Sequence, residues 1–260
     1  MLEQLHAAVR ALWTDPQPNA TWVLLEEQLL HSRIPDLVLV RIDISVLRAR
    51  ISGNWSRPLR LTELRVVRAL RSDRSTRLDT IARRARTSIA STRKTLSALV
   101  RDRFVTGDAA MGFRRHSPIR PIAQRVVTFE AKRSDPGRAL SQARAHRAWA
   151  NETYVAFDAE YRRRFLAYAD VYSRLGLGLI EITPEAWKRV KTARPHRRSD
   201  RLEAGLVGER VLARLLGHPD ADRPERRLPH GAILPRTPRP LIVGADASWV
   251  RTLARRRRDR

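Results

Sequence analysis

The chain has 260 residues, of which 52 are Lys or Arg and 27 are Asp or Glu, giving a formal net charge of +25. Apolar residues make up 42% of the sequence, enough to bury a core, which argues against a fully disordered basic protein. The absence of cysteine excludes disulfide scaffolds, thiolate zinc sites and cysteine nucleophiles.

Apolar runs in the sequence are short, and none approaches the roughly 18 residues that a membrane-spanning helix needs. The amino-terminal residues also lack the charged-then-apolar pattern of a secretory signal. We therefore expect a cytoplasmic protein with no membrane partner.

The positive charge predicts a polyanionic partner. All but four of the 52 basic residues are arginine, a preference that a GC-rich genome would explain. Base composition explains the excess of basic over acidic residues less well. Each phosphate that a basic side chain neutralises releases counterions and adds affinity whatever the base sequence. We therefore expect the protein to bind double-stranded DNA.

The charge is distributed unevenly along the chain. The net charge is −1 over residues 1–56, +11 over 57–115, +3 over 116–185 and +12 over 186–260. Two nearly neutral segments thus flank a basic block, which indicates a domain inserted into another. We expect the first part of an α/β core at residues 1–56, an inserted domain at 57–116, the second part of the core at 117–184 and a basic C-terminal extension at 185–260.

The first neutral segment has the pattern of a helix followed by two strands. Apolar residues at helical spacing predict a helix over residues 2–12. Val, Leu and Ile are concentrated in residues 21–30 and 34–43, which we expect to form two strands.

The basic block has the pattern of three helices followed by a β-ribbon. We expect a first helix capped by Thr62, a second after residues 75–76 and a third after residues 86–88. Their apolar positions are Leu64, Val67 and Leu70, then Leu78, Ile81 and Ala82, then Ile89, Leu96, Leu99 and Val100. Residues 104–106 and 111–115 predict two strands joined by a turn. This order of elements is that of a winged helix-turn-helix domain.

After the basic block, strands alternate with helices, as in an α/β core. We expect strands at residues 125–132, 153–157 and 177–182, and helices at 136–150 and 160–174. Beyond residue 184 we expect a helix at 201–216, a loop rich in Pro and Arg at 219–240, and a basic tail at 255–260.

Charged side chains interrupt two of the apolar strands. Asp36 stands at the start of one, and Glu130 and Lys132 end another, where the two-residue period points both to the same face. Charges on a buried strand are costly unless they are compensated. A divalent cation held by Asp36 and Glu130 would compensate them, and Mg²⁺ suits so sparse a set because it binds one or two carboxylates plus water and substrate phosphate.

These residues resemble the motif of the PD-(D/E)XK nuclease superfamily. Pro35-Asp36 matches the first half of the motif and Glu130-Ala131-Lys132 the second. The order of elements (helix, three strands, helix, strand) is similar too. The resemblance implies a restriction-endonuclease-like mixed sheet flanked by helices, interrupted here by a winged helix-turn-helix domain.

The resemblance also implies a role for each residue of the motif. Asp36 and Glu130 would bind Mg²⁺ or Mn²⁺, Lys132 would orient or activate the attacking water, and Gln142 on the next helix would position the scissile backbone. A third carboxylate found upstream in some members would be Glu26 or Glu27. Spacing alone does not choose between these two, and we include Glu27 among the expected metal ligands.

Two features depart from the superfamily pattern. Asp36 and Glu130 are 94 residues apart, a gap that only an inserted domain explains. Related nucleases often carry a tyrosine four residues after the glutamine, where this chain has His146.

A structural interpretation stays open for each candidate. Asp36 would then be a turn residue after Pro35, Glu130 and Lys132 a solvated pair on an edge strand, and Gln142 a surface residue of its helix. The histidines lack the spacing of metal ligands, and we expect surface positions for His31, His116 and His146.

The start of the third helix in the basic block is the candidate DNA-reading element, because helix amino termini enter the major groove in this architecture. Small hydroxyl residues beside Arg or Lys suit contacts to phosphates and base edges. The expected DNA-binding residues are Arg86, Thr87, Ser88, Ser91, Thr92, Arg93 and Lys94 on the helix, with Arg114 and Arg115 on the β-ribbon. Solvated surface residues of a helical bundle are the alternative.

Two functions remain open from the sequence. The first is a metal-dependent DNA endonuclease whose winged helix grips the duplex. The second is a non-catalytic DNA-binding transcriptional regulator with an inert nuclease-like core. A homodimer is left open as an oligomeric state.

Overall fold

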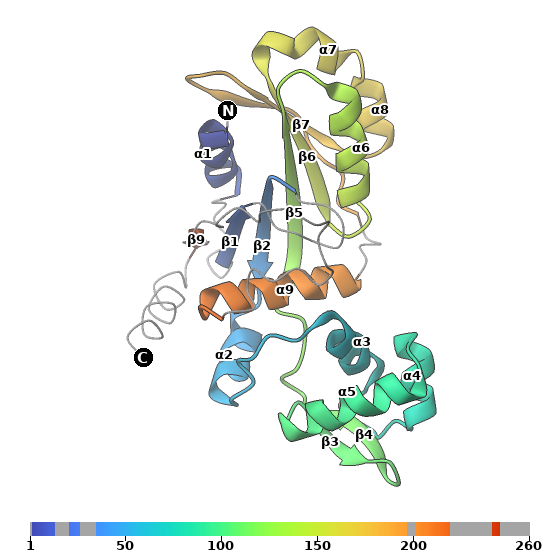
Figure 1. The fold of residues 1–260 in the computed structure, drawn as a ribbon. Coiled ribbons are helices and arrows are strands. Elements are labelled where there is room, and N and C mark those ends of the chain that lie inside the picture. The colour runs from blue at the N-terminus through green and yellow to red at the C-terminus, as the bar shows by residue number, and fades with distance from the viewer. Residues whose placement is uncertain (1, 14–20, 27–34, 197–200, 219–240, 245–260) are drawn as a thin grey trace, which may run out of the picture.

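Figure 1 shows an elongated molecule with a β-sheet at one end and a helical unit at the other. Helix α9 (Arg201–Leu215) lies between them. The computed structural model of the chain describes residues 2–13, 21–26, 35–196, 201–218 and 241–244. Glu27, His31, the expected loop at 219–240 and the expected tail at 255–260 therefore lie outside the described residues.

The sheet is mixed and has seven strands among the described residues, in the order β8-β7-β6-β5-β2-β1-β9. Strands β5, β6 and β7 run parallel, and all other neighbours are antiparallel. The strands are β1 (Thr21–Glu26), β2 (Leu37–Ile42), β5 (Ala123–Lys132), β6 (Glu152–Asp158), β7 (Gly178–Ile182), β8 (Trp187–Lys191) and β9 (Leu241–Gly244).

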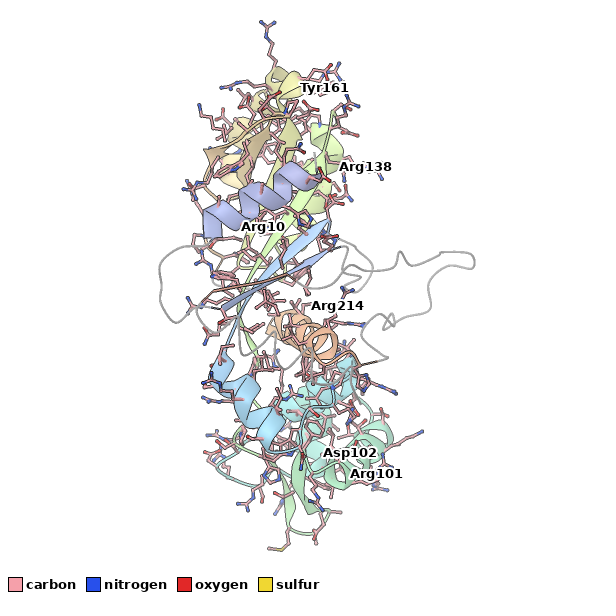
Figure 2. All side chains as sticks on the ribbon, turned by 90° about the vertical axis from the view of Figure 1, so that its left-hand side faces the viewer. Arg10, Arg101, Asp102, Arg138, Tyr161 and Arg214 are labelled. Carbon is pink, nitrogen blue, oxygen red and sulfur yellow. The ribbon has the colours of Figure 1, made fainter. Side chains whose placement is uncertain are left out.

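Helices cover both faces of the sheet. On one face, Leu5 of α1 (Leu2–Trp13) and Phe129 belong to one buried cluster, and Figure 2 shows this helix, which carries Arg10, lying across the strands. On the other face, Val211 of α9 shares a cluster with Val40. The remaining covering helices are α6 (Pro136–His146), the short 3-10 helix η1 (Ala159–Tyr161), α7 (Arg162–Leu166) and α8 (Ala169–Arg174). Burial on both faces explains why the central strands are continuously apolar rather than alternating.

The helical unit is inserted between β2 and β5 and has its own core, which includes Leu64, Ile81 and Leu96. Its elements are α3 (Leu61–Ala69), α4 (Leu78–Ala85), α5 (Ile89–Arg101), β3 (Val105–Asp108) and β4 (Gly112–Arg115). Helix α2 (Ile44–Ser52) leads from β2 into this unit, but its buried apolar residues pack in the cluster of the sheet. Thr76, just before α4, exchanges two backbone hydrogen bonds of 2.8 and 2.9 Å with Phe113. The two-stranded ribbon is therefore tied to the helices.

Both connections to the helical unit leave the sheet at the same end, where Ile42 of β2 pairs with Ala123 of β5. Helix α9 packs against this end and against α3. Two of its glycines allow the approach: a Cβ on Gly205 would lie 3.0 Å from Leu64 Cδ2, and one on Gly208 would lie 2.9 Å from the Ala123 nitrogen.

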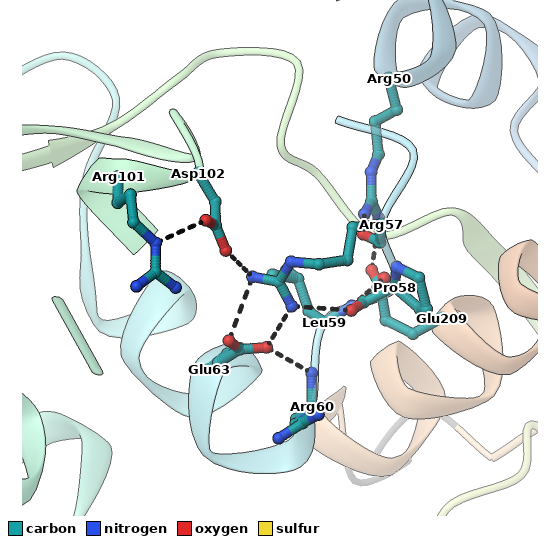
Figure 3. A network of polar contacts seen from close by, with 9 residues as sticks. All are labelled: Arg50, Arg57, Pro58, Leu59, Arg60, Glu63, Arg101, Asp102 and Glu209. Atoms are coloured by element: carbon teal, nitrogen blue, oxygen red, sulfur yellow. Dashed lines mark hydrogen bonds and ion pairs between the residues drawn. The ribbon is translucent and has the colours of Figure 1, made fainter. Parts of the chain in front are cut away.

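A buried ion pair joins α9 to the helical unit (Figure 3). The fully buried guanidinium of Arg50 donates to Glu209 Oε1 at 2.5 Å and to the Arg57 carbonyl oxygen at 3.1 Å. The other oxygen of Glu209 accepts from the Leu59 nitrogen at 2.8 Å. A buried charge pair with its remaining hydrogen bonds satisfied fixes the connecting segment in one geometry.

Arg57 extends this network toward α5 (Figure 3). Its guanidinium lies 2.9 Å from Glu63 of α3 and 2.9 Å from Asp102, the residue after α5. The Arg57 guanidinium also lies over the Phe104 ring, 5.1 Å from its centroid. The segment that leads into the helical unit is thus held by α3, α5 and α9 together.

The prediction of an α/β protein with a mixed sheet flanked by helices is confirmed in this general form. Three details differ. Arg60 rather than Thr62 precedes α3 as its cap, and its backbone N–H donates to the Glu63 side chain at 2.8 Å. The helix expected at 136–150 ends at His146, and the one expected at 160–174 is divided into η1, α7 and α8.

Three elements were not expected from the sequence: α2, β8 and β9. Strands β8 and β9 form the two edges of the sheet, and α9 joins the sheet to the helical unit. The segment expected to be a basic extension from residue 185 onward therefore contributes two strands and a bridging helix to the architecture.

Candidate functional site

The charged residues of the expected motif meet at the end of the sheet that lies away from the helical unit. Asp36 directly precedes β2, and the pairing of β2 with β5 places it beside Glu130. Glu130 and Lys132 lie on one face of β5, the face that α6 covers. Asp36 Oδ2 accepts a hydrogen bond of 2.6 Å from the Ala131 nitrogen, which fixes this carboxylate to β5.

Lys132 links the two carboxylates. Its Nζ lies 2.5 Å from Glu130 Oε1 and 3.8 Å from Asp36 Oδ2. Nζ also donates to the Ala131 carbonyl oxygen at 3.2 Å. Three of the four expected catalytic residues are therefore brought together.

The environment of Glu130 disfavours its charge. Burial and the neighbouring Asp36 carboxylate raise the pKa of Glu130 to about 7, although Lys132 and Arg138 act in the opposite direction. The Glu130 side chain is 1% exposed, and its Oε2 accepts no hydrogen bond from any described residue. A buried acceptor without a donor is costly, so this oxygen is suited to a cation or a proton.

Helix α6 brings a histidine to the site. His146 was expected at the surface, but its side chain is only 1% exposed and its Nδ1 lies 3.8 Å from Glu130 Oε2. The expectation was wrong because the buried face of α6 runs through this position. Gln142, the fourth expected catalytic residue, lies one turn earlier, and its buried Oε1 accepts no hydrogen bond from the described residues. The four-residue spacing on one helix was the available sequence signal for His146.

Glu26, one of the two alternatives for a third carboxylate, lies on the other face of the sheet. Glu26 lies two residues after Leu24 on β1, so both side chains point to the same face, and Leu24 packs in the cluster with α1 on that face. Glu26 Oε1 lies 3.1 Å from His6 Nε2 of α1. Glu26 therefore does not join Asp36 and Glu130.

The donor set is small for a metal centre. Within the described ranges, no group of three or more His, Asp or Glu residues is arranged to hold an ion. Asp36 and Glu130 nevertheless offer hard carboxylate oxygens from adjacent strands, and one of those oxygens is buried without a hydrogen-bond donor. These residues fit an Mg²⁺ or Mn²⁺ site that completes its coordination with water and substrate phosphate.

The second group of expected residues lies at the start of α5. Ser88 is the N-cap, and its Oγ accepts from the Ser91 nitrogen at 3.1 Å. The exposed members of the group are Arg86, Ser88, Ser91, Arg93 and Lys94. Three cations and two hydroxyls are thus presented to solvent around one helix amino terminus.

Thr92 belongs to the core, contrary to the expectation that it contacts DNA. It has no exposed surface, and its Oγ1 donates to the Ser88 carbonyl oxygen at 2.9 Å. The hydroxyls of Thr92 and Thr87 are 2.7 Å apart and share a hydrogen bond. Both threonines therefore brace the turn before α5.

The two ribbon arginines differ in exposure. Arg114 is exposed, whereas Arg115 is half-buried and donates to the Ile119 carbonyl oxygen at 2.8 Å. Burial, together with the neighbouring Arg120, lowers the pKa of Arg115. Arg114 is therefore the ribbon cation that faces solvent.

Two large apolar residues of the helical unit are exposed. Ile89 is 52% exposed at the first position of α5, although its spacing predicted a core position, and Met111 is 77% exposed at the turn between β3 and β4. Exposed apolar side chains beside cations suit contacts with thymine methyl groups or base steps. The helical spacing of Ile89 did not reveal its exposure, because this residue lies in the first turn of α5, where the neighbouring residues are exposed too.

The two sites lie at opposite ends of the molecule. Strand β5 starts beside the helical unit at Ala123 and ends at Lys132, and nine extended steps span about 30 Å. The figures agree, because Arg138 of α6 and Arg101 at the end of α5 lie far apart along the long axis (Figure 2).

Comparisons with family models, curated proteins and solved structures gave no match to this chain. Within the described residues, no helix has the length and apolar character needed to cross a membrane. The function is therefore inferred from the geometry of the two sites.

Proposed function

We propose that the protein is a metal-dependent DNA endonuclease that hydrolyses phosphodiester bonds at Asp36, Glu130 and Lys132. The convergence of these three side chains at one end of the sheet carries the proposal, because Asp36 lies 94 residues before Glu130 in the sequence and a buried carboxylate beside a second one is costly. The resemblance to the PD-(D/E)XK superfamily, with a restriction-endonuclease-like core, supports the same assignment.

Each residue has a defined task in the proposed reaction. Asp36 and Glu130 would hold Mg²⁺ or Mn²⁺, which when bound supplies charge stabilisation at the phosphate and acidifies a water. Lys132 Nζ, already beside both carboxylates, would orient the attacking water and hydrogen-bond to a phosphate oxygen. Gln142 would contact the scissile backbone. Glu130 has to be ionised for this work, so its raised pKa makes the reaction favour neutral to alkaline solution.

The helical unit would grip the duplex as a winged helix-turn-helix domain. Its three helices and ribbon occur in the order of that domain, and the ribbon is tied to Thr76 by two backbone hydrogen bonds. The amino terminus of α5 would enter the major groove with Arg93 and Lys94, while Arg114 of the ribbon contacts the adjacent backbone.

Cleavage of plasmid and oligonucleotide DNA in Mg²⁺, Mn²⁺ or EDTA tests this proposal. Glu130→Ala and Asp36→Asn should abolish metal-dependent cutting, and Lys132→Ala should slow it more than it weakens metal binding. Glu160→Gln, which changes an exposed carboxylate of η1, is the matched control and should cut normally. Cleavage that persists in Glu130→Ala would refute the site.

A non-catalytic DNA-binding regulator is the second candidate function. The close pairing of Lys132 with Glu130 favours it, because the lysine occupies one oxygen of the carboxylate when no metal is bound. This function is the one to adopt if the wild-type protein binds DNA and cuts no substrate in either metal.

A further inference from the structure

A hollow of about 660 Å³ opens between the end of α3, the end of α4 and the start of α9. Five of its lining residues are arginines: Arg65, Arg68, Arg71, Arg84 and Arg86. The others are apolar: Ala69, Leu70, Ala85 and Leu202. The hollow is therefore lined by five arginines, which we call the arginine ring, and by four apolar residues.

The charge of this ring is poorly compensated. No lining residue is acidic, although Arg71 has an ion pair with Asp73 at 2.9 Å just outside the hollow. In the described part of the chain, no carboxylate pairs with Arg65, Arg84 or Arg86. Like charges gathered in one concavity repel one another, and a bound anion would relieve that repulsion.

Arg86 has a strained backbone at the rim of the hollow. It ends α4 in the left-handed region, with φ 54° and ψ 51°, where glycine is the favoured residue. The sequence keeps a long cation at a position that folding alone would give to glycine. Strain retained in this way points to a role for the side chain itself.

The size and chemistry of the hollow define its ligand. Its volume lies within the range of small-molecule sites. Guanidinium groups match phosphate oxygens through paired hydrogen bonds, and the apolar lining residues suit a sugar or base. We propose that the arginine hollow binds a ligand with two or more linked phosphates, supplied by a free nucleotide or by a nucleic-acid backbone.

This site is independent of the proposed nuclease chemistry. The hollow lies in the helical unit, whereas Asp36 and Glu130 lie at the far end of the sheet. Arg86 immediately precedes the Thr87-Ser88 turn that starts α5, so a ligand in the hollow would lie next to the expected DNA-reading helix. Loss of cleavage in Glu130→Ala would therefore leave this proposal untouched.

Calorimetric titration of the full chain with tripolyphosphate, ATP and a short DNA duplex tests the site. The double variant Arg65→Ala with Arg84→Ala should weaken binding of at least one of these ligands about tenfold, since two charge-assisted contacts are lost. Arg163→Ala with Arg164→Ala removes two exposed charges from α7 and is the matched control, with an expected change below about twofold.

The pattern of losses identifies the source of the phosphates. If the Arg65→Ala and Arg84→Ala double variant binds tripolyphosphate and ATP more weakly and the control variant does not, the ligand is a free nucleotide. An unchanged or absent response to these two ligands, with weaker duplex binding and a salt slope lower by about two, supports the nucleic-acid backbone. Equal losses in the hollow and control variants, or no loss in either, would overturn the proposal.

The variant Arg86→Gly provides a second test of ligand binding, in which a loss of affinity cannot be explained by unfolding. Glycine suits the left-handed backbone at this position, so the variant should fold at least as well as wild type. It should nevertheless bind the same phosphate ligand several-fold more weakly. Undiminished affinity in this folded variant would count against a role for the Arg86 side chain.

Discussion

The two ends of the molecule handle charge in opposite ways. At the end of the sheet, the charges of Asp36, Glu130 and Lys132 are few and are held within hydrogen-bonding distance of one another or of the backbone, with Glu130 buried and the other two partly buried. On the helical unit, cations such as Arg93 and Lys94 are many and exposed.

This difference separates what each end can do. Buried and fixed charges interact strongly because little water screens them, which suits the orientation of reacting atoms. Exposed charges are individually weak but act together on a polyanion, which suits attraction and grip. Helix α9 and the Arg50–Glu209 pair join the two ends into one body.

The largest expected effect comes from breaking that join. Glu209→Ala leaves the Arg50 guanidinium buried without its carboxylate, which should lower the free energy of unfolding by about 3–5 kcal/mol. Urea unfolding followed by circular dichroism measures the loss. Glu160→Ala, which removes an exposed partner of Arg133, should change stability by less than about 0.5 kcal/mol. Similar losses in the two variants would mean that the junction is not special.

The next effect concerns the buried end and its pH dependence. Folding raises the pKa of Glu130 to about 7 from a usual value near 4.5, so the native state holds a proton that the unfolded state releases between those pH values. The metal-free protein should therefore lose about 2–3 kcal/mol of stability as the pH rises from 4.5 to 7. Thermal unfolding in EDTA should show this slope in the wild type and a flatter one in Glu130→Gln. Equal slopes would refute the raised pKa.

A smaller effect is expected at the exposed end. Arg93→Ala with Lys94→Ala should weaken duplex binding about tenfold and reduce the salt slope by about two, because two phosphate contacts are lost. Fluorescence anisotropy at several salt concentrations measures both quantities, with the Arg163→Ala and Arg164→Ala double variant as control. An unchanged slope would remove the start of α5 from the DNA interface.

The smallest effect concerns backbone strain in the helical unit. Arg86→Gly should raise the free energy of unfolding by about 0.5–1 kcal/mol, because glycine adopts the left-handed conformation without a clash of its side chain. Chemical denaturation at neutral pH measures the gain. A loss of stability would show that the Arg86 side chain contributes contacts that outweigh the strain.

Sequence patterns predicted those helices and strands whose own residues are apolar at the buried positions. Helices α3, α4 and α5 carry apolar residues at helical spacing, the central strands are short continuous apolar runs, and each of these elements was predicted. Helix α2 was missed because its buried face includes Arg50, whose partner Glu209 lies 159 residues away. Strand β8, with three basic residues in five, has the composition of a solvated segment and becomes a strand by pairing with β7.

The site was predictable to the same extent. Asp36, Glu130 and Lys132 could be chosen because charges on apolar strands are rare and follow a recognisable order. The burial of Thr92 could not be predicted, since the turn geometry before α5 sets it, and the burial of His146 was indicated only by its four-residue spacing from Gln142. The spacing of residues along a helix shows which of them share a face, but it does not show which other element packs against that face.

The most direct test of the division between a cutting end and a gripping end measures cleavage and affinity on the same duplex. Glu130→Gln should lower the single-turnover cleavage rate at saturating protein by about 10³-fold or more and leave the Kd within about twofold of wild type. Arg93→Ala with Lys94→Ala should raise the Kd about tenfold and leave the saturated rate unchanged. If both variants changed only the cleavage rate or only the Kd, the division would be contradicted. A Glu130→Gln protein that still cuts at the wild-type rate would contradict it too.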